Sequence, residues 1–166
     1  MTRSTKSNAK VAVITGSAGG LGNAIATCLA KDGFRVVLHD ISEDNLKKAK
    51  AEFDKAGYES ITVVGDVSKR ADQFRLIEEA VKAFGQVDVF VNNAGVESVE
   101  PFLEIEEKEL DRVMNVNIKG VVFGTQAAAE QMKKQNNVSK IINACSIAGH
   151  ESYEMLSLYS ATKHAV

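Results

Sequence analysis

Tyr159 and Lys163 are a pair of residues whose types and spacing could carry out proton chemistry. If this stretch is helical, residues four apart lie on one face and their side chains can interact. A phenol has a reference pKa near 10. A cation about 4 Å away, at an effective dielectric constant of about 20, favours the phenolate by about 4 kcal/mol, or about three pKa units. The pair could therefore transfer protons near neutral pH, although two residues on a solvated helix face would share the same spacing.

A glycine-rich segment at residues 16–22 is a second candidate site, and it follows a compact apolar run. Glycines allow a backbone to approach a phosphate closely, and the N-terminus of a following helix supplies N–H donors and partial positive charge. The spacing of Gly16, Gly20 and Gly22 predicts a phosphate-binding turn. A tight strand-to-helix turn without a ligand is an equally good reading of the same spacing.

Asp40 stands at the end of the second apolar run, where a carboxylate can accept hydrogen bonds from an adenosine ribose. The same carboxylate would repel a 2′-phosphate, which carries about −1.5 to −2 charges. This position therefore favours NAD over NADP, and an aspartate in a surface loop is the alternative. Asp66 and Val67 end the third run, and residues 92–95 end the fourth.

Apolar runs alternate along the chain with segments of helical periodicity. Each run is continuously apolar, which is typical of a parallel sheet covered on both faces. Right-handed crossovers then favour a doubly wound, Rossmann-type α/β sheet with ligands at the carboxyl ends of the strands. Strands are expected at 10–15, 34–38, 61–64, 87–91 and 140–145, with helices capped by Ser42 and Ser68, a long helix over 106–134 and a last one holding Tyr159.

The composition is that of an ordinary globular protein, with 45% apolar and 25% charged residues. We expect one domain over residues 1–166. The net charge of −2, with both signs mixed throughout, indicates no nucleic-acid partner and no membrane surface. The apolar run 11–14 is too short for a signal peptide or a membrane span, so we expect a cytoplasmic protein.

The histidines and cysteines show no spacing typical of a metal site. We expect no metal, with His39, His150 and His164 in solvent-facing or loop positions. Cys28 and Cys145 fall in a predicted helix and a predicted buried strand, so reduced, packed thiols are expected.

Taken in order, these motifs resemble the classical short-chain dehydrogenase/reductase family. The resemblance rests on T-G-x-x-x-G-L-G at 15–22, N-N-A-G at 92–95, N-V-N-I-K-G at 115–120, N-A-C-S at 143–146 and Y-x-x-x-K at 159–163. It implies an NAD-dependent oxidoreductase that transfers hydride between nicotinamide and a ketone or secondary alcohol. The implied cofactor-binding residues are Gly16, Gly20, Leu21, Gly22, Asp40, Asp66, Val67, Asn93, Ala94, Gly95, Tyr159 and Lys163.

The resemblance also implies four catalytic residues. Tyr159 would be the general acid and base, and Lys163 would lower the pKa of Tyr159 and hold the nicotinamide ribose. Ser146 would hydrogen-bond the substrate oxygen, so Ser146 and Tyr159 would bind the substrate. Asn117 would perturb its long helix and hold a water for proton relay.

Within the family, segments 120–128 and 140–150 are most similar to diacetyl/acetoin reductases and 2,3-butanediol dehydrogenases. A small ketone or vicinal diol is therefore the expected substrate. Ile147 and Tyr153 depart from those enzymes, which typically have Gln and Asn there. Another secondary alcohol, a sugar alcohol or a hydroxysteroid remains an alternative.

Members of this family continue well beyond the length of this chain, with further parallel strands and helices used in subunit packing. We therefore expect a domain that is incomplete at its C-terminus and a homo-oligomer, a dimer or tetramer, in the full-length form. A catalytically inactive module that binds nucleotide or a partner is the alternative.

Overall fold

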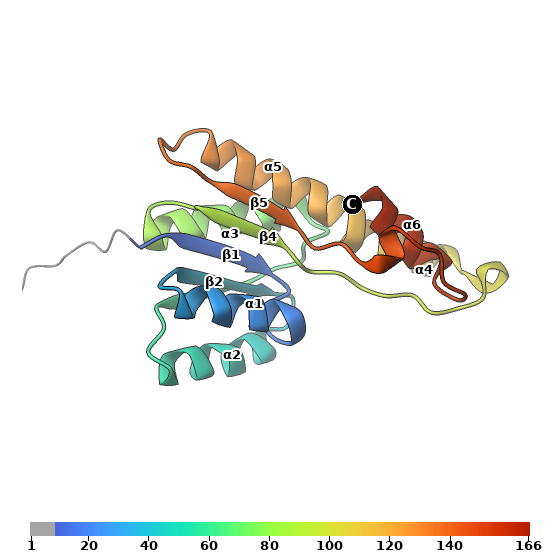
Figure 1. The fold of residues 1–166 in the computed structure, drawn as a ribbon, viewed down its shortest axis with the longest axis horizontal. Coiled ribbons are helices and arrows are strands. Elements are labelled where there is room, and N and C mark those ends of the chain that lie inside the picture. Colours follow the sequence, from blue (N-terminus) through green and yellow to red (C-terminus); the bar gives the residue numbers. More distant parts are fainter. Residues whose placement is uncertain (1–8) are drawn as a thin grey trace, which may run out of the picture.

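Five parallel strands form a single sheet in the computed structural model, which describes residues 9–166 (Figure 1). The strands lie in the order β3-β2-β1-β4-β5, which confirms the predicted doubly wound fold. The fourth strand starts later than expected and the fifth ends earlier, before Cys145. The strands are β1 Val11–Thr15, β2 Arg35–Asp40, β3 Ser60–Val64, β4 Val89–Asn92 and β5 Lys140–Asn143.

Helices cover both faces of the sheet, as continuous apolar strands require. On one face Leu38 packs with residues of α1 (Gly20–Lys31) and α2 (Glu43–Lys55). On the other face Val37 packs with residues of α3 (Arg70–Phe84) and α5 (Gly120–Met132). Adjacent residues of β2 thus pack into two separate hydrophobic cores, and the sheet forms the central layer between them.

The chain reverses its winding direction between β1 and β4, which are parallel neighbours in the sheet. From β1 the chain moves outward through β2 to β3, and α3 then returns it to the far side of β1. In such sheets ligands bind at the carboxyl ends of the strands at this reversal. The loops after β1 and β4 are therefore the part of the fold on which a site depends.

Two helix starts test the predicted caps. Ser42 caps α2 as expected, with its hydroxyl accepting a hydrogen bond from the N–H of Asn45. The cap predicted at Ser68 is wrong, because α3 begins at Arg70 and Lys69 precedes it. The backbone N–H of Ser68 donates instead to the Asp66 carboxylate, 2.9 Å away, so Ser68 belongs to a turn.

The long helix expected over 106–134 is interrupted at Asn117. It consists of α4 (Glu107–Met114), a π-helical turn η2 (Asn115–Lys119) and α5. This interruption agrees with the local perturbation that the family resemblance implies. The remaining elements are short, with 3₁₀ turns η1 (Phe102–Glu104) and η3 (Ile147–Gly149) and the last helix α6 (Ser157–Ala165).

Two expectations about unassigned side chains are wrong. Cys28 and Cys145 are free thiols but both are exposed, because Cys145 lies in the loop after β5 and Cys28 on the outer side of α1. His39 is buried within β2 at 1% exposure, while His150 and His164 are exposed as expected. No helix in residues 9–166 is long and apolar enough to cross a membrane.

Candidate active site

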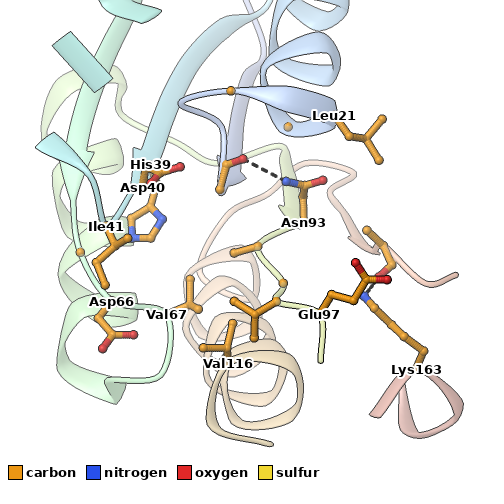
Figure 2. A pocket seen from close by; sticks show the side chains of 18 of the residues that line it. Leu21, His39, Asp40, Ile41, Asp66, Val67, Asn93, Glu97, Val116 and Lys163 are labelled. Carbon is orange, nitrogen blue, oxygen red and sulfur yellow. Dashed lines mark hydrogen bonds between the residues drawn. The ribbon is translucent and has the colours of Figure 1, made fainter. Parts of the chain in front are cut away.

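A cleft of about 550 Å³ opens at the carboxyl edge of the sheet, across the reversal between β1 and β4 (Figure 2). Most of the residues expected in a site line this cleft. Gly20, Asn117 and Ser146 do not line it. Those that do are Gly16, Leu21, Gly22, Asp40, Asp66, Val67, Asn93, Ala94, Gly95, Tyr159 and Lys163.

The glycine turn after β1 is packed too closely for side chains. A Cβ added at Gly22 would lie 2.1 Å from the Gly16 carbonyl oxygen and 2.5 Å from Asn93 Nδ2. Gly16 has a φ of +63°, and a Cβ there would lie 2.9 Å from the Cα of Ala94. A Cβ at Gly20, by contrast, would meet no described atom within 4 Å. The first turn of α1 therefore faces open space, as an anion-binding helix N-terminus must.

Thr15, at the end of β1, ties this turn to the loop after β4. Its hydroxyl accepts hydrogen bonds from the N–H groups of Asn93 and Ala94, each at 3.0 Å. The Asn93 side-chain amide donates in return to the carbonyls of Thr15 and Gly16, at 2.9 and 3.1 Å. Asn93 is thus a structural clamp as well as a lining residue. Sequence reasoning assigned no role to Thr15, although a hydroxyl residue at a buried strand end was a usable signal.

Asp40 is held at the lip of the cleft by backbone donors. Its carboxylate accepts hydrogen bonds from the N–H groups of Ala18 at 3.2 Å and Ser42 at 3.1 Å. These bonds fix the carboxylate between the glycine turn and the start of α2 and leave lone pairs for a further donor. The position thus suits recognition of a hydroxyl-bearing ligand.

The turn after β3 is organised by a second aspartate. The N–H of Asp66 donates a hydrogen bond to the Asp72 carboxylate at 2.9 Å, and the Arg75 guanidinium donates another. Both bonds hold the pKa of Asp72 below its ordinary value, and the bond from Asp66 has the larger effect. Val67 adds an apolar wall that is 8% exposed. The turn therefore offers both an apolar surface and a fixed carboxylate, that of Asp66, to the cleft.

His39 lines the cleft beside this turn, a position that the sequence did not indicate (Figure 2). Burial lowers the pKa of His39 to about 4, although Asp40, Asp72 and Asp66 partly oppose the shift. Neither ring nitrogen has a hydrogen-bond partner among the described residues. A Cβ at Gly65 would lie 2.9 Å from Nε2, so the neutral ring packs directly against the turn.

Asn117 joins three segments from its place in the π-helical turn. Its Oδ1 accepts from the N–H of Val96 at 2.9 Å, and its Nδ2 donates to the Val96 carbonyl at 2.9 Å and to the Thr162 hydroxyl at 3.0 Å. The Thr162 hydroxyl donates onward to the Tyr159 carbonyl at 2.8 Å. Asn117 therefore positions the β4 loop and α6 relative to each other, and its part in a proton relay stays a prediction.

Lys163 brings a buried cation to the floor of the cleft. Its Nζ donates to the Ala144 carbonyl at 2.9 Å and lies 5.7 Å from the centroid of the Tyr159 ring. The side chain is 7% exposed, and burial lowers its pKa while the nearby Cys145 opposes that shift. A phenol and an ammonium thus share one wall of the cleft, as their spacing predicted.

Ser146 stands at the start of η3, outside the cleft lining. Its hydroxyl accepts a hydrogen bond from the N–H of Ala148 at 3.2 Å. Cys145 lines the cleft in its place, with its thiol donating to the Lys163 carbonyl at 3.2 Å. Sequence reasoning missed this position because it extended β5 through Cys145. The substrate-binding role of Ser146 stays a prediction.

No group of three or more metal-ligating side chains occurs in the part of the chain that the structure describes.

The chain matches the family model described as short chain dehydrogenase over residues 10–166. It is 57% identical over 157 residues to an (S)-acetoin-forming diacetyl reductase of Staphylococcus epidermidis, covering 95% of this chain and 61% of that protein. It is 38% identical over 159 residues to an L-2,3-butanediol dehydrogenase of Corynebacterium glutamicum, covering 95% of this chain and 62% of that one. The chain thus spans a little over 60% of the length of these relatives.

Solved structures agree with these matches. A short chain dehydrogenase/reductase from Burkholderia phymatum in complex with NAD has a TM-score of 0.93 and 38% identity, covering 95% of this chain and 56% of that one. A gluconate 5-dehydrogenase from Burkholderia cenocepacia, in complex with NADP and tartrate, has a TM-score of 0.87 and 33% identity, covering 94% and 61%. With the glycine turn and the Tyr159–Lys163 pair in one cleft, this chain belongs to the short-chain dehydrogenase family.

Proposed function

We propose that the protein is an NAD(H)-dependent oxidoreductase that transfers hydride between nicotinamide and a small ketone or secondary alcohol. The observation that carries the proposal is that Tyr159 and Lys163 line the same cleft as the glycine turn and Asp40. One end of the cleft can therefore bind a dinucleotide, and the other can transfer a proton.

The residues of the first end fit a dinucleotide. The open N-terminus of α1 suits a pyrophosphate, since nothing in the described chain would meet a Cβ at Gly19 or Gly20 within 4 Å. Asp40 would accept hydrogen bonds from the adenosine ribose and would repel a 2′-phosphate, which favours NAD. Ile41 and Val67 offer apolar surface at the same end for the base.

The residues of the second end fit proton transfer. Bound NAD(H) would supply or accept the hydride. Tyr159 would give a proton to the carbonyl oxygen during reduction and remove it from the alcohol during oxidation. The Lys163 ammonium, which is 7% exposed and lies 5.7 Å from the centroid of the Tyr159 ring, would stabilise negative charge that develops on the phenol oxygen during the proton transfer. Ser146, which follows the cleft-lining Cys145 in the chain, would donate to the substrate oxygen.

The substrate we propose is a small ketone or vicinal diol of the acetoin, diacetyl and 2,3-butanediol type. The names of the relatives in Staphylococcus epidermidis and Corynebacterium glutamicum support this class. Ile147 and Tyr153, which stand where Gln and Asn were expected, are 63% and 39% exposed and do not line the cleft, so the proposed substrate class does not rest on them.

We also infer that the protein works as a homo-oligomer, a dimer or tetramer. Leu110 and Met114 of α4 and Val122 of α5 are exposed apolar residues, at 42%, 38% and 46%. Light scattering that shows only monomer would contradict this inference. A cytoplasmic location stays a prediction from the composition.

The test is an assay of NADH oxidation with diacetyl and acetoin, with NADH binding measured by calorimetry. We expect turnover by the wild type and at least about a hundredfold loss in Tyr159→Phe, because general acid–base groups contribute that much or more. Binding of NADH without turnover would favour the inactive nucleotide-binding module instead. Failure to bind NADH would contradict both readings.

A further inference from the structure

Glu97 is an exposed carboxylate in the cleft to which no family motif in the sequence assigned a function. Figure 2 shows it on the same side of the cleft as Lys163 and away from Asp66. Of the charged residues lining the cleft, Asp40 and Asp66 belong to the dinucleotide end. Glu97 and Lys163 belong to the end that carries Tyr159.

The backbone that carries Glu97 is fixed on both sides. The peptide groups of Val96 are clamped by Asn117, whose amide both accepts from and donates to them at 2.9 Å. The carbonyl of Glu97 itself accepts from Arg112 Nη2 at 2.8 Å, and Ser98 is buried at 4% exposure. The direction in which this side chain leaves the loop is therefore set by the fold.

That fixed backbone lies beside the catalytic cation. A Cβ added at Gly95 would lie 3.7 Å from Lys163 Nζ, so the loop passes the ammonium two residues before Glu97. The Glu97 carboxylate therefore emerges close to where the substrate must meet Tyr159. It is a charged acceptor at the reacting end of the cleft.

Nearby cations do not neutralise this carboxylate. Lys163 Nζ donates to the Ala144 carbonyl and forms no ion pair with Glu97 among the described residues. The Arg112 guanidinium is occupied by Glu109, with contacts of 2.6 and 2.8 Å, and reaches only the backbone oxygen of Glu97. The carboxylate oxygens of Glu97 thus have no hydrogen-bond or ion-pair partner among the described residues and can accept hydrogen bonds from a ligand.

We propose that Glu97 determines substrate specificity by rejecting carboxylate-bearing substrates and accepting a hydrogen bond from a hydroxyl beside the reacting carbon. This inference rests on the function proposed above and names the chemical class that the same site selects. A carboxylate only accepts hydrogen bonds, so it pairs with the hydroxyl of an α-hydroxyketone or vicinal diol. It repels a second negative charge brought close to it in the cleft. Selection between these substrates depends on repulsion of the carboxylate as much as on attraction of the hydroxyl.

Steady-state kinetics with three substrates of similar size test this role. Diacetyl has no donor, acetoin has a hydroxyl donor, and 2-oxobutanoate has a carboxylate. In Glu97→Gln, the ratio of kcat/KM for 2-oxobutanoate to that for diacetyl should rise at least about tenfold, because the repulsion is removed while shape is kept. The ratio for acetoin to diacetyl should fall about threefold, since a charged acceptor becomes a neutral one. Glu104→Gln, an exposed glutamate outside the cleft, should leave both ratios within twofold of wild type.

A binding measurement separates failure of this role from failure of the proposed function. Isobutyramide and isobutyrate have nearly the same shape and differ in charge, so their dissociation constants can be compared with NADH present and without turnover. Wild type should prefer the amide, and Glu97→Gln should reduce that preference at least about tenfold. Equal effects of Glu97→Gln on all three substrates, or an unchanged preference for the amide, would overturn the role. Absence of turnover by the wild type with a retained amide preference would overturn only the enzymatic function.

Discussion

In the half of the cleft formed by β1, β2 and the start of the β4 loop, the backbone is closely packed. In the half formed by the β5 loop and α6, a few side-chain hydrogen bonds hold the elements together. The first half contains the Gly16–Gly22 contact and the Thr15–Asn93 hydrogen bonds, all within buried or half-buried turns. The second half depends on the hydrogen bond from Lys163 to the Ala144 carbonyl and on Asn117, beside a strand β5 that is largely exposed. Close backbone packing is therefore a constraint on the geometry of the first half, whereas the second half depends on side-chain hydrogen bonds.

This contrast predicts different responses to substitution in the two halves. A Cβ added at a packed glycine should disrupt the geometry of the first half. Removal of one hydrogen-bonding or charged atom should disrupt the geometry of the second.

The Lys163→Met variant tests the second half most strongly. It keeps side-chain volume but removes the cation near Tyr159 and leaves the Ala144 carbonyl without its donor. We expect kcat/KM to fall at least about a hundredfold, with the optimum for alcohol oxidation moving to higher pH. Lys140→Met, on the exposed face of β5, is the matched control and should stay within twofold of wild type. Comparable activity in the two variants would mean that the ammonium does not contribute to the chemistry.

The pH dependence of the free energy of unfolding tests the burial of His39 in the first half. The pKa of His39 is about 4 in the folded chain and about 6.5 when exposed, so the unfolded state takes up the proton first. The stabilisation that comes from a neutral His39 is fully present above pH 6.5 and is lost as the pH falls towards 4. The loss in the free energy of unfolding is about 3 kcal/mol, at about 1.36 kcal/mol per pKa unit. Urea unfolding of His39→Phe between these pH values should show a smaller loss than wild type.

The exposed His150 provides the comparison for that measurement. His150→Gln is the control for the loss of a histidine at an exposed position, and it should lose as much stability as wild type between pH 6.5 and 4. If His39→Phe and wild type lost the same stability between pH 6.5 and 4, the buried imidazole would not be the source.

Gly22→Ala tests the steric packing of the first half. The new Cβ would lie 2.1 Å from the Gly16 carbonyl oxygen, so the turn must move. We expect a loss of about 1–3 kcal/mol in the free energy of unfolding and weaker NADH binding by calorimetry. Gly19→Ala is the control, because a Cβ there meets no described atom within 4 Å and the backbone is extended. Equal stability of the two variants would show that the turn is not tightly packed.

Asp40→Ala tests the charge at the rim of the first half. Removal of the carboxylate should lower the preference for NAD over NADP by about tenfold, because the repulsion of a 2′-phosphate is lost. Dissociation constants of NADH and NADPH for wild type and variant give the ratio. An unchanged ratio would assign cofactor choice to other residues.

The sheet and most of the cleft could be predicted from the sequence because continuous apolar runs and turn motifs encode them locally. The strand ends place Asp40, Asp66 and Asn93 at one edge without knowledge of any contact. The role of Asn117 as a clamp required the positions of Val96 and Thr162, which are distant in the chain. Such contacts leave no periodic signal.

The wrong predictions have a common physical cause. His39 was expected in a solvent or loop role because it showed no metal-ligand spacing and no carboxylate partner in the sequence, yet it is buried against the turn after β3. Cys145 was expected in a buried strand, but pairing with β4 ends at Asn143 and the following loop turns into the cleft. A single sequence indicates which residues are apolar, but it does not indicate which neighbours cover a polar one.

The proposed function requires one dinucleotide to span both halves of the cleft. A crystal structure of the protein with NADH tests this directly. We predict the adenosine ribose on the Asp40 carboxylate, the pyrophosphate at the N-terminus of α1 and the nicotinamide beside Tyr159 and Lys163. A nicotinamide bound away from Tyr159, or a dinucleotide bound outside this cleft, would contradict the proposed function.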